Sequence, residues 1–360
     1  MSLKTQINTK FDYKEWDNLL MKIPHSTAFQ MSCNYDPYKI AFGSIPLYVT
    51  VEDSTGKILG QLLAVQHFQN FTRESDSLFQ SLTSKLNIGS IINWHYGPIV
   101  HDDERSEEII KNILEALDKY CLENKVLLIK GSSPVDSKTQ HRNCFTKYQF
   151  ENISWDTWIT SLKPELNSIY DSLHNKTRYD VRKGEKANLV FETVSDRSVL
   201  DEWMEVKFSE NKNKKELIKK YEKFNDSTWE ILYKPEYEKM FVARLDEQLI
   251  SGIANKLFNY NVVQHAVVNS VKKIQGGSFV TWNTIKWSKE NKFFTYDMGG
   301  ANPHPISNKE KGIRHFKSKW NGTKYNFELV MKPYNKNKLK LFRTLNSPNL
   351  IREKISSFFK

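Results

Sequence analysis

The sequence of 360 residues is poor in cysteine and has no long apolar run. Its three cysteines, Cys33, Cys121 and Cys144, are odd in number, and no two of them form a Cys-x-x-Cys pair. That argues against a disulfide framework and against a zinc site. No apolar stretch approaches the roughly 18 residues of a membrane-spanning helix, and the N-terminal segment lacks the apolar centre of a signal peptide. We therefore expect a cytoplasmic protein without a transmembrane segment.

Several catalytic signatures are also missing. The sequence has no Gly-x-Ser-x-Gly elbow, no His-Glu-x-x-His motif, no Walker loop and no Gly-x-Gly-x-x-Gly loop. Cys121 lies among apolar residues of a predicted helix, so we expect it in the core rather than in a catalytic site. We expect neither a metal ion nor a tightly bound cofactor.

The sequence is rich in positive charge and in aromatic residues. It has 53 Lys and Arg against 42 Asp and Glu, which gives a formal charge of +11, and 13% of its residues are aromatic. Such a surplus favours an anionic partner, for example RNA, a nucleotide-linked substrate or a lipid headgroup. The alternative is that the charge has no partner, since many soluble proteins are this basic and bind nothing acidic.

Hydrophobic periodicity predicts the same order of elements twice. In each half, a β-hairpin precedes a helix with apolar residues at helical spacing, and an apolar strand follows the helix. The first copy comprises residues 47–51, 58–65, 104–124 and 126–129, and the second comprises 240–245, 249–254, 262–268, 278–290 and 293–297. The copies start about 190 residues apart, so a duplicated α/β unit is the simplest account, although a hairpin followed by a helix is a common combination.

We therefore predict an α/β (α+β) protein of two tandem lobes, residues 1–155 and 156–330. Each lobe is expected to be a mixed, mostly antiparallel sheet flanked by helices. Between the two copies, residues 164–225 are highly charged and largely helical. Residues 331–360 form a basic tail with an amphipathic end at 351–359, which we expect to pack back on the N-terminal lobe. We expect a monomer.

Two segments of the second copy stand out. Residues 296–303 place an acidic residue and a Gly-Gly pair directly after a strand, which brings the backbone close to a ligand or to another segment. Residues 311–322 place Arg314, Lys317 and Lys319 after a glycine turn, where cations can neutralise a phosphate or a developing oxyanion. The alternative is an exposed basic helix start with its aromatic residues in the core.

A third segment opens the predicted helix of the second copy. Gln275, Gly276 and Gly277 precede this helix, and such a turn can cradle a pyrophosphate at a helix N-terminus, as GNAT enzymes do for CoA. Equally, it can be a plain loop that leads into a helix.

The order of these motifs resembles the C-terminal signature of the FemABX family. Tyr-Asp-Met-Gly-Gly at residues 296–300 is followed by Gly312, by the pair Phe316-Lys317 and by Trp-Asn-Gly at 320–322. Two upstream segments add to the resemblance, the basic run at residues 174–186 and the Tyr-Gly-Pro-Ile-Val element at 96–100. The resemblance covers most of residues 25–330 and implies two GNAT-like lobes.

The resemblance also implies an activity, the transfer of an amino acid from aminoacyl-tRNA to the peptide of a peptidoglycan precursor. Lys317 matches the family lysine on the donor side, where aminolysis of an ester builds negative charge on the carbonyl oxygen. Asp297 and His265 are candidate bases, because the attacking amine must be neutral. The candidate substrate-binding residues are Phe316, Arg314, Arg178, Tyr179, Tyr96, Tyr38 and Lys39, and the candidate cofactor-binding residues are Gln275, Gly276 and Gly277.

The sequence departs from the family pattern on the acceptor side. Residues 264–270 stand where the family has a tyrosine-rich strand, and His95-Tyr96 stands where it has Pro-Arg. Residues 204–224 show no sustained heptads, so we expect no long helical arm. These departures leave the acceptor open.

Three functions therefore remain under consideration. The first is a tRNA-dependent aminoacyltransferase that acts on an anionic envelope or glycan precursor. The second is a GNAT-type N-acyltransferase that takes its acyl group from acyl-CoA. The third is a non-catalytic Fem-like protein that only binds an anionic polymer or headgroup. None of the three involves DNA.

Overall fold

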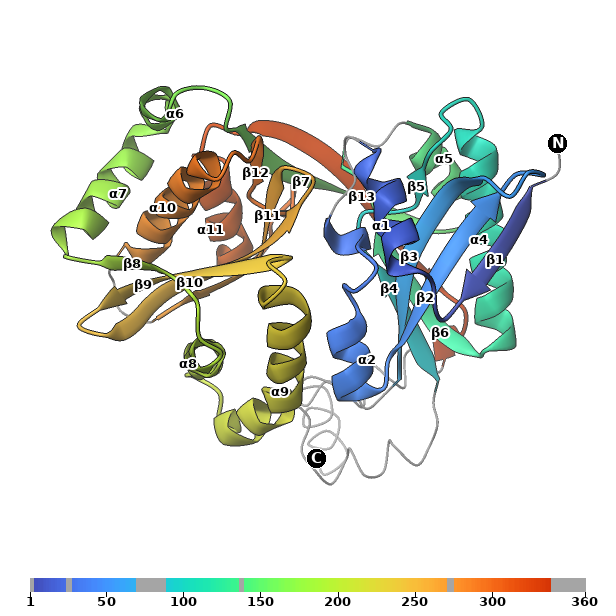
Figure 1. The fold of residues 1–360 in the computed structure, drawn as a ribbon, viewed down its shortest axis with the longest axis horizontal. Helices are drawn as coiled ribbons and strands as arrows, with labels where there is room; N and C mark the ends of the chain where they lie inside the picture. Colours follow the sequence, from blue (N-terminus) through green and yellow to red (C-terminus); the bar gives the residue numbers. More distant parts are fainter. Residues whose placement is uncertain (1–2, 24–27, 69–88, 136–138, 271–274, 338–360) are drawn as a thin grey trace, which may run out of the picture. The chain divides into compact units, whose positions relative to one another are not determined.

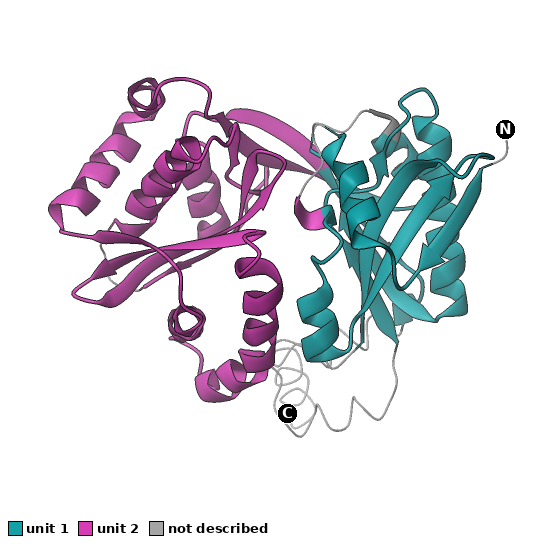
Figure 2. Cartoon of the chain, viewed as in Figure 1, with its two compact units in different colours: residues 1–26, 30–153, 328–360 teal, residues 27–29, 154–327 magenta. Residues whose placement is uncertain are grey.

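The structure, a computed structural model, describes residues 3–23, 28–68, 89–135, 139–270 and 275–337. The chain divides into two compact units (Figure 2). Unit 1 comprises residues 1–26, 30–153 and 328–360, and unit 2 comprises residues 27–29 and 154–327. None of the described helices has the length and apolar character that crossing a membrane requires.

The sheet of unit 1 has the strand order β1-β2-β3-β4-β6-β13, with β5 beside β3 (Figure 1). β4 and β6 are parallel, and the other neighbours are antiparallel. Its strands are β1 (Lys4–Asn8), β2 (Ile45–Glu52), β3 (Ile58–Phe68), β4 (Ser90–Trp94), β5 (Ile99–Val100), β6 (Val126–Ser132) and β13 (Thr323–Pro333). Its helices are α1 (Tyr13–Met21), α2 (Asp36–Phe42), α4 (Ser106–Glu123) and α5 (Thr139–Lys147), and the short η1 (Ala28–Gln30) spans the unit boundary.

The core of unit 1 forms because α4 is amphipathic. Its apolar residues recur at helical spacing and bury one face of the helix against the sheet. Glu107 and Glu108 in its first turn favour the helix start, since the helix dipole is positive there. Cys121 lies in this core and is fully buried, as predicted. All three cysteines are buried, and none of them forms a disulfide bond.

The sheet of unit 2 has the order β7-β12-β11-β10-β9-β8, with β11 and β12 parallel. Its strands are β7 (Glu151–Ser161), β8 (Val190–Thr193), β9 (Glu238–Leu245), β10 (Gln248–Phe258), β11 (Asn261–Asn269) and β12 (Thr295–Asp297). Its helices are α6 (Leu166–Ser172), α7 (Asn175–Lys186), α8 (Ser198–Lys207), α9 (Lys214–Thr228), the π-helical turn η3 (Trp229–Tyr233), α10 (Gly276–Glu290) and α11 (Asn308–Lys317).

Helices cover the unit 2 sheet on opposite faces (Figure 1). On one face, Phe279 and Val280 of α10 pack against β9 and β10, and α7 packs on α10. On the other face, Trp203 and Met204 of α8 pack against the same strands. The last strand of each half lies in the other unit, because β7 follows α5 but pairs with β12, and β13 follows α11 but pairs with β6.

The predicted two-lobed α/β architecture, with its two hairpin-helix-strand copies, is confirmed. Three details differ. The helical stretch at 165–186 is broken at Leu173 and His174, because the His174 N–H donates to the Lys319 carbonyl instead of continuing α6. β8 was not predicted, and Gly312 lies inside α11 rather than in a turn. The predicted amphipathic end, 351–359, lies outside the described residues.

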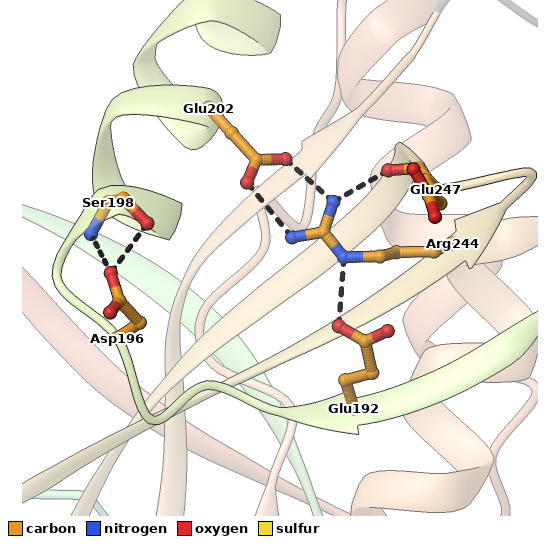
Figure 3. A network of polar contacts seen from close by, with 6 residues as sticks. All are labelled: Glu192, Asp196, Ser198, Glu202, Arg244 and Glu247. Carbon is orange, nitrogen blue, oxygen red and sulfur yellow. Dashed lines mark hydrogen bonds and ion pairs between the residues drawn. The ribbon is translucent and has the colours of Figure 1, made fainter.

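An arginine ties the edge strand of unit 2 to α8 (Figure 3). Arg244 of β9 donates from Nε to Glu192 of β8 at 2.8 Å, and from both Nη atoms to Glu202 of α8. Nη1 also bonds the backbone carbonyl of Glu247 at 2.9 Å. The arginine side chain is 13% exposed, so this fork is shielded from water better than an ordinary surface pair.

We expect Arg244→Gln to lower the free energy of unfolding by about 1 to 2 kcal/mol, because it removes several charge-assisted hydrogen bonds to half-exposed carboxylates. Urea unfolding would measure the loss. Lys234→Gln is the control, since its pair with Glu230 is local and exposed, and we expect no measurable change there. Equal stability of Arg244→Gln and the wild type would show that the network contributes nothing.

Candidate active site

The candidate active site of unit 2 begins where two parallel strands part. β11 and β12 pair over three residues and end with Val263 opposite Asp297. β11 then continues to Asn269, whereas β12 stops. Within the described residues no strand lies beside this edge of β11 beyond Val263. Its backbone groups must therefore bond other segments, water or a substrate.

A β-bulge lies at the same place on β11. In the pairing of β10 with β11, Ala254 faces Ala266 and Asn255 faces Gln264, so His265 is the extra residue. A bulge increases the local twist and re-aims side chains. The bulge lies just beyond the last residue of β11 that pairs with β12. His265 therefore lies at the splay, the point at which the two strands diverge.

Lys317, the last residue of α11, supplies a cation next to the splay. Its Nζ donates to the carbonyl oxygen of Gly300 at 2.9 Å, in the loop that follows β12. Burial lowers the pKa of Lys317 to about 8, and the nearby carboxylate of Asp297 only partly opposes this. An ammonium has three donors, so two remain for an oxygen of a substrate in a site where water screens little.

Asp297 holds the loop that carries this carbonyl. Its Oδ1 accepts hydrogen bonds from the Thr157 hydroxyl at 2.5 Å and from the Gly299 N–H at 2.8 Å. The side chain is 6% exposed, and burial raises its pKa although both hydrogen bonds and Lys317 act in the opposite direction. The carboxylate is thus well placed to shape the loop, and its role as a base stays a prediction.

The Gly-Gly pair allows a close approach of two chain segments. Gly299 has a φ of +72°, and a Cβ there would lie 2.6 Å from the Gln264 carbonyl oxygen and 3.4 Å from Lys317 Nζ. A Cβ on Gly300 would lie 2.7 Å from the Trp155 ring. The sequence left open whether the glycines approach a ligand or another segment of the chain. In the structure they approach another segment. The loop can therefore lie against β11 and hold Lys317 near the splay.

An ion pair fixes α11. Asp156 is 1% exposed, and its carboxylate binds the Arg314 guanidinium and, at 2.6 Å, the Asn326 amide. The guanidinium also lies over the Trp158 ring, 5.3 Å from its centroid. Arg314 thus positions α11, and its role in binding substrate stays a prediction. Phe316 is half-buried against Trp320, in the core that α11 shares with α10.

The basic helix α7 is tied to the chain directly after α11. The His174 N–H and the Thr177 hydroxyl donate to the Lys319 carbonyl at 3.2 and 3.3 Å. Arg178 is hydrogen-bonded within α6 and α7, and the Tyr179 side chain is 52% exposed. The other cations of this helix are Lys176, Arg182, Lys183 and Lys186, all of them exposed. α7 therefore presents positive charge close to the segment that contains Lys317.

The start of α10 bears on the cofactor prediction. Gln275 is the N-cap without a side-chain cap, and Gly276 and Gly277 form the first turn. A Cβ on Gly276 would lie 2.9 Å from side chains of β10, whereas one on Gly277 would meet only the Asn269 side chain, at 3.2 Å. N–H groups of a first turn lack intrahelical partners and bind anions. Pyrophosphate binding stays a prediction, since residues 271–274 lie outside the described residues.

His265 faces a buried carboxylate that the sequence did not reveal. Its Nε2 lies 3.2 Å from an oxygen of Glu238, which is 3% exposed, and the second oxygen is paired with Lys256. Burial alone would raise the pKa of Glu238, but the charges of Lys256 and His265 lower it to about 2. The Tyr233 hydroxyl, in the core beneath α8, is also hydrogen-bonded to Glu238.

The remaining predicted residues belong to unit 1, so their relation to Lys317 stays a prediction. Tyr96 is 7% exposed with a φ of +55°, and its N–H donates to the Ser132 hydroxyl at 2.8 Å. Tyr38 and Lys39 lie in α2, where the Tyr38 ring is 5.6 Å from that of His67. A cavity of about 360 Å³ lies where β4 and β6 part. Its lining includes Asn93, His95, Lys130 and Ile153.

Sequence reasoning missed Asp156, Thr157 and Glu238. Each lies on a strand or beside one and acts on a residue more than 25 positions away, so no local spacing points to it. Among the described residues, no group of three His, Cys, Asp or Glu side chains could hold a metal ion.

We expect Gly299→Ala to lower the free energy of unfolding by about 2 kcal/mol, because the left-handed φ and the Gln264 carbonyl both oppose a Cβ. Gly312→Ala is the matched control, since nothing lies within 4 Å of its Cβ position, and helix propensity predicts a gain of up to about 1 kcal/mol. Chemical unfolding of both variants measures the difference. If Gly299→Ala were as stable as the wild type, a Cβ at this position would not be opposed by the Gln264 carbonyl.

Lys317 should make stability depend on pH. Its pKa is lowered from 10.5 to about 8, so between these values the unfolded chain binds more protons and the free energy of unfolding rises with pH. We expect Lys317→Met to lack this rise. Below pH 8 the free energy of unfolding of Lys317→Met should exceed that of the wild type by about 2 kcal/mol. This difference should shrink towards pH 10. Parallel curves from urea unfolding at several pH values would contradict this.

Comparisons with known proteins bear on the fold. No protein-family model matches the sequence, and no curated protein matches it. Among the similar solved structures is FemX, with 14% identity, a TM-score of 0.65, and coverage of 96% of this chain and 100% of that chain. A tandem GNAT protein from the clavulanic acid biosynthesis pathway has 10% identity, a TM-score of 0.56, and coverage of 93% and 99%.

A third similar structure is L-PGS from Bacillus licheniformis, with 11% identity, a TM-score of 0.52, and coverage of 93% of this chain and 98% of that chain. At these identities the likeness concerns the fold. Two units with mixed sheets, in this order of elements, thus have the tandem GNAT-like fold that FemX also has, as the motifs predicted.

Proposed function

We propose that this chain is an N-acyltransferase that moves an aminoacyl group from aminoacyl-tRNA to an amine, with its chemistry at the splay of unit 2. The observation that carries the proposal is the Lys317 ammonium, held at 2.9 Å by the Gly300 carbonyl beside the edge of β11 that has lost its strand partner. The ammonium keeps N–H donors free for a substrate oxygen beside this edge.

These donors suit the aminolysis of an ester. When the amine attacks the carbonyl carbon of the donor, negative charge develops on the carbonyl oxygen, and donors fixed in advance stabilise it at no cost of rearrangement. The ester is already activated, so holding the two substrates together suffices and no covalent enzyme intermediate is needed.

The choice of donor rests on charge and on the family resemblance. The exposed cations of α7 lie beside the segment that contains Lys317, and the formal charge of the chain is +11. Phosphates of a tRNA acceptor stem require such neutralisation. Aminoacyl-tRNA is a cytoplasmic substrate, so we propose that the protein acts in the cytoplasm. The acceptor is proposed to be an amine of an envelope or glycan precursor, and Tyr96, Tyr38 and Lys39 of unit 1 are proposed to contact it.

Acyl-CoA is the second candidate donor. It is favoured by the uncapped helix start at Gly276 and Gly277 and by the likeness in fold to a tandem GNAT protein. A ligand that binds only the folded state raises its melting temperature. Stabilisation by CoA but not by tRNA would favour this donor.

We expect Lys317→Ala to reduce transfer by about 100- to 1000-fold, the usual effect of removing one donor to an oxyanion. Transfer of radiolabelled amino acid from charged tRNA to a precursor amine would be measured. Lys311→Ala is the matched control, because this exposed lysine lies on the same helix, and it should retain activity. Undiminished transfer by Lys317→Ala would overturn the role of Lys317.

A further inference from the structure

The two faces of the unit 2 sheet carry different groups at the splay. α7, α10 and α11 lie on one face, and with them come Lys317 and the exposed cations of α7 (Figure 1). On the α8 face lie Glu238, Lys256 and His265, because Lys256 stands two residues from Ala254, which packs under α8. One face therefore suits an anionic donor, and the other carries a histidine and a carboxylate.

The histidine belongs to the same part of the chain as the oxyanion donors. It directly follows Gln264, whose carbonyl oxygen lies 2.6 Å from the Cβ position of Gly299. That position is in turn 3.4 Å from Lys317 Nζ. The imidazole is 23% exposed, with the Phe29 ring edge-on at 6.3 Å. It is thus within one residue of the splay and open to a small reactant.

Glu238 orients this imidazole. Its carboxylate lies 3.2 Å from Nε2, so Nε2 carries the proton in the neutral ring and Nδ1 carries the lone pair. Among the described residues, nothing else is hydrogen-bonded to the ring. Lys256 keeps the carboxylate of Glu238 ionised, so Glu238 holds the ring by accepting from Nε2 and does not take its proton.

We propose that His265, oriented by Glu238, removes the proton from the acceptor amine, and that the acceptor therefore reaches the donor carbonyl from the α8 face of the unit 2 sheet. This inference rests on the proposed transferase function. It makes the acceptor a primary amine that is protonated in solution and that needs a base before it can attack.

The acceptor ammonium gives one proton to Nδ1 of His265, and the imidazolium passes that proton to solvent. The neutral amine nitrogen then forms a bond to the acyl carbon of the donor, and the bond between that carbon and the ribose oxygen breaks. As the amide forms, the nitrogen loses a second proton to solvent, and the leaving ribose oxygen takes up one proton from solvent.

An amine that is already neutral at pH 7 tests the assignment, because it needs no base. Transfer from charged tRNA to N-acetyl-lysine amide would be compared with transfer to hydroxylamine, which is largely unprotonated. We expect His265→Gln to reduce the first by at least about 100-fold and to leave the second within about threefold of the wild type. His304→Gln, at an exposed loop histidine, is the control.

Glu238 is tested in the double variant Glu238→Gln/Lys256→Gln, which removes both buried charges together and so avoids an unpaired ammonium. A melting curve would show that the double variant is folded. We expect it to lose transfer to N-acetyl-lysine amide but not to hydroxylamine, by a smaller factor than His265→Gln. Equal losses with both amines in His265→Gln would overturn the role of His265. Failure of the wild type with both amines would overturn the proposed transferase function itself.

Discussion

The parting of β11 from β12 is the constraint on which the rest of unit 2 depends. A strand edge that loses its neighbour leaves backbone donors and acceptors that must find other partners. Here the loop after β12 lies against this edge, and it can do so because Gly299 has no side chain next to the Gln264 carbonyl. The buried carboxylate of Asp297 holds this loop from within, and the loop carbonyl in turn holds Lys317. One backbone feature thus fixes both the opening and the cation beside it.

In unit 1, a tryptophan side chain lies where two parallel strands part. Its parallel strands β4 and β6 also part after a short ladder, which ends with Asn93 opposite Lys130. There the Trp94 indole donates to the Gly97 and Ser132 carbonyls, at 3.0 and 3.1 Å. A glycine is again needed, since a Cβ on Gly131 would lie 2.0 Å from that ring. The two units thus share a topology but differ where their parallel strands part. Unit 1 has the Trp94 indole there, and unit 2 has Lys317.

Buried charges mark the parts of unit 2 whose position matters. Removing a carboxylate from water costs several kcal/mol, and an ion pair in the interior seldom adds net stability. Asp156 with Arg314 fixes α11, and Glu238 with Lys256 sits behind the bulge at His265. The first pair joins elements that are 158 residues apart in the sequence, and the second joins the neighbouring strands β9 and β10. Their value lies in holding one arrangement of the site, which an apolar contact would specify less strictly.

The sequence by itself determined the order of the elements, the duplication and the glycine pair after the last strand of unit 2, because these follow from local periodicity and from backbone freedom at single residues. It also drew attention to Lys317 and His265. Only the tertiary structure decided what these residues face. The break between α6 and α7 and the roles of Asp156 and Thr157 arise from contacts between distant segments, and the bulge at His265 and the role of Glu238 arise from how neighbouring strands pair. Such contacts leave no spacing in the chain, since their free energy depends on burial and pairing that exist only once the sheet has formed.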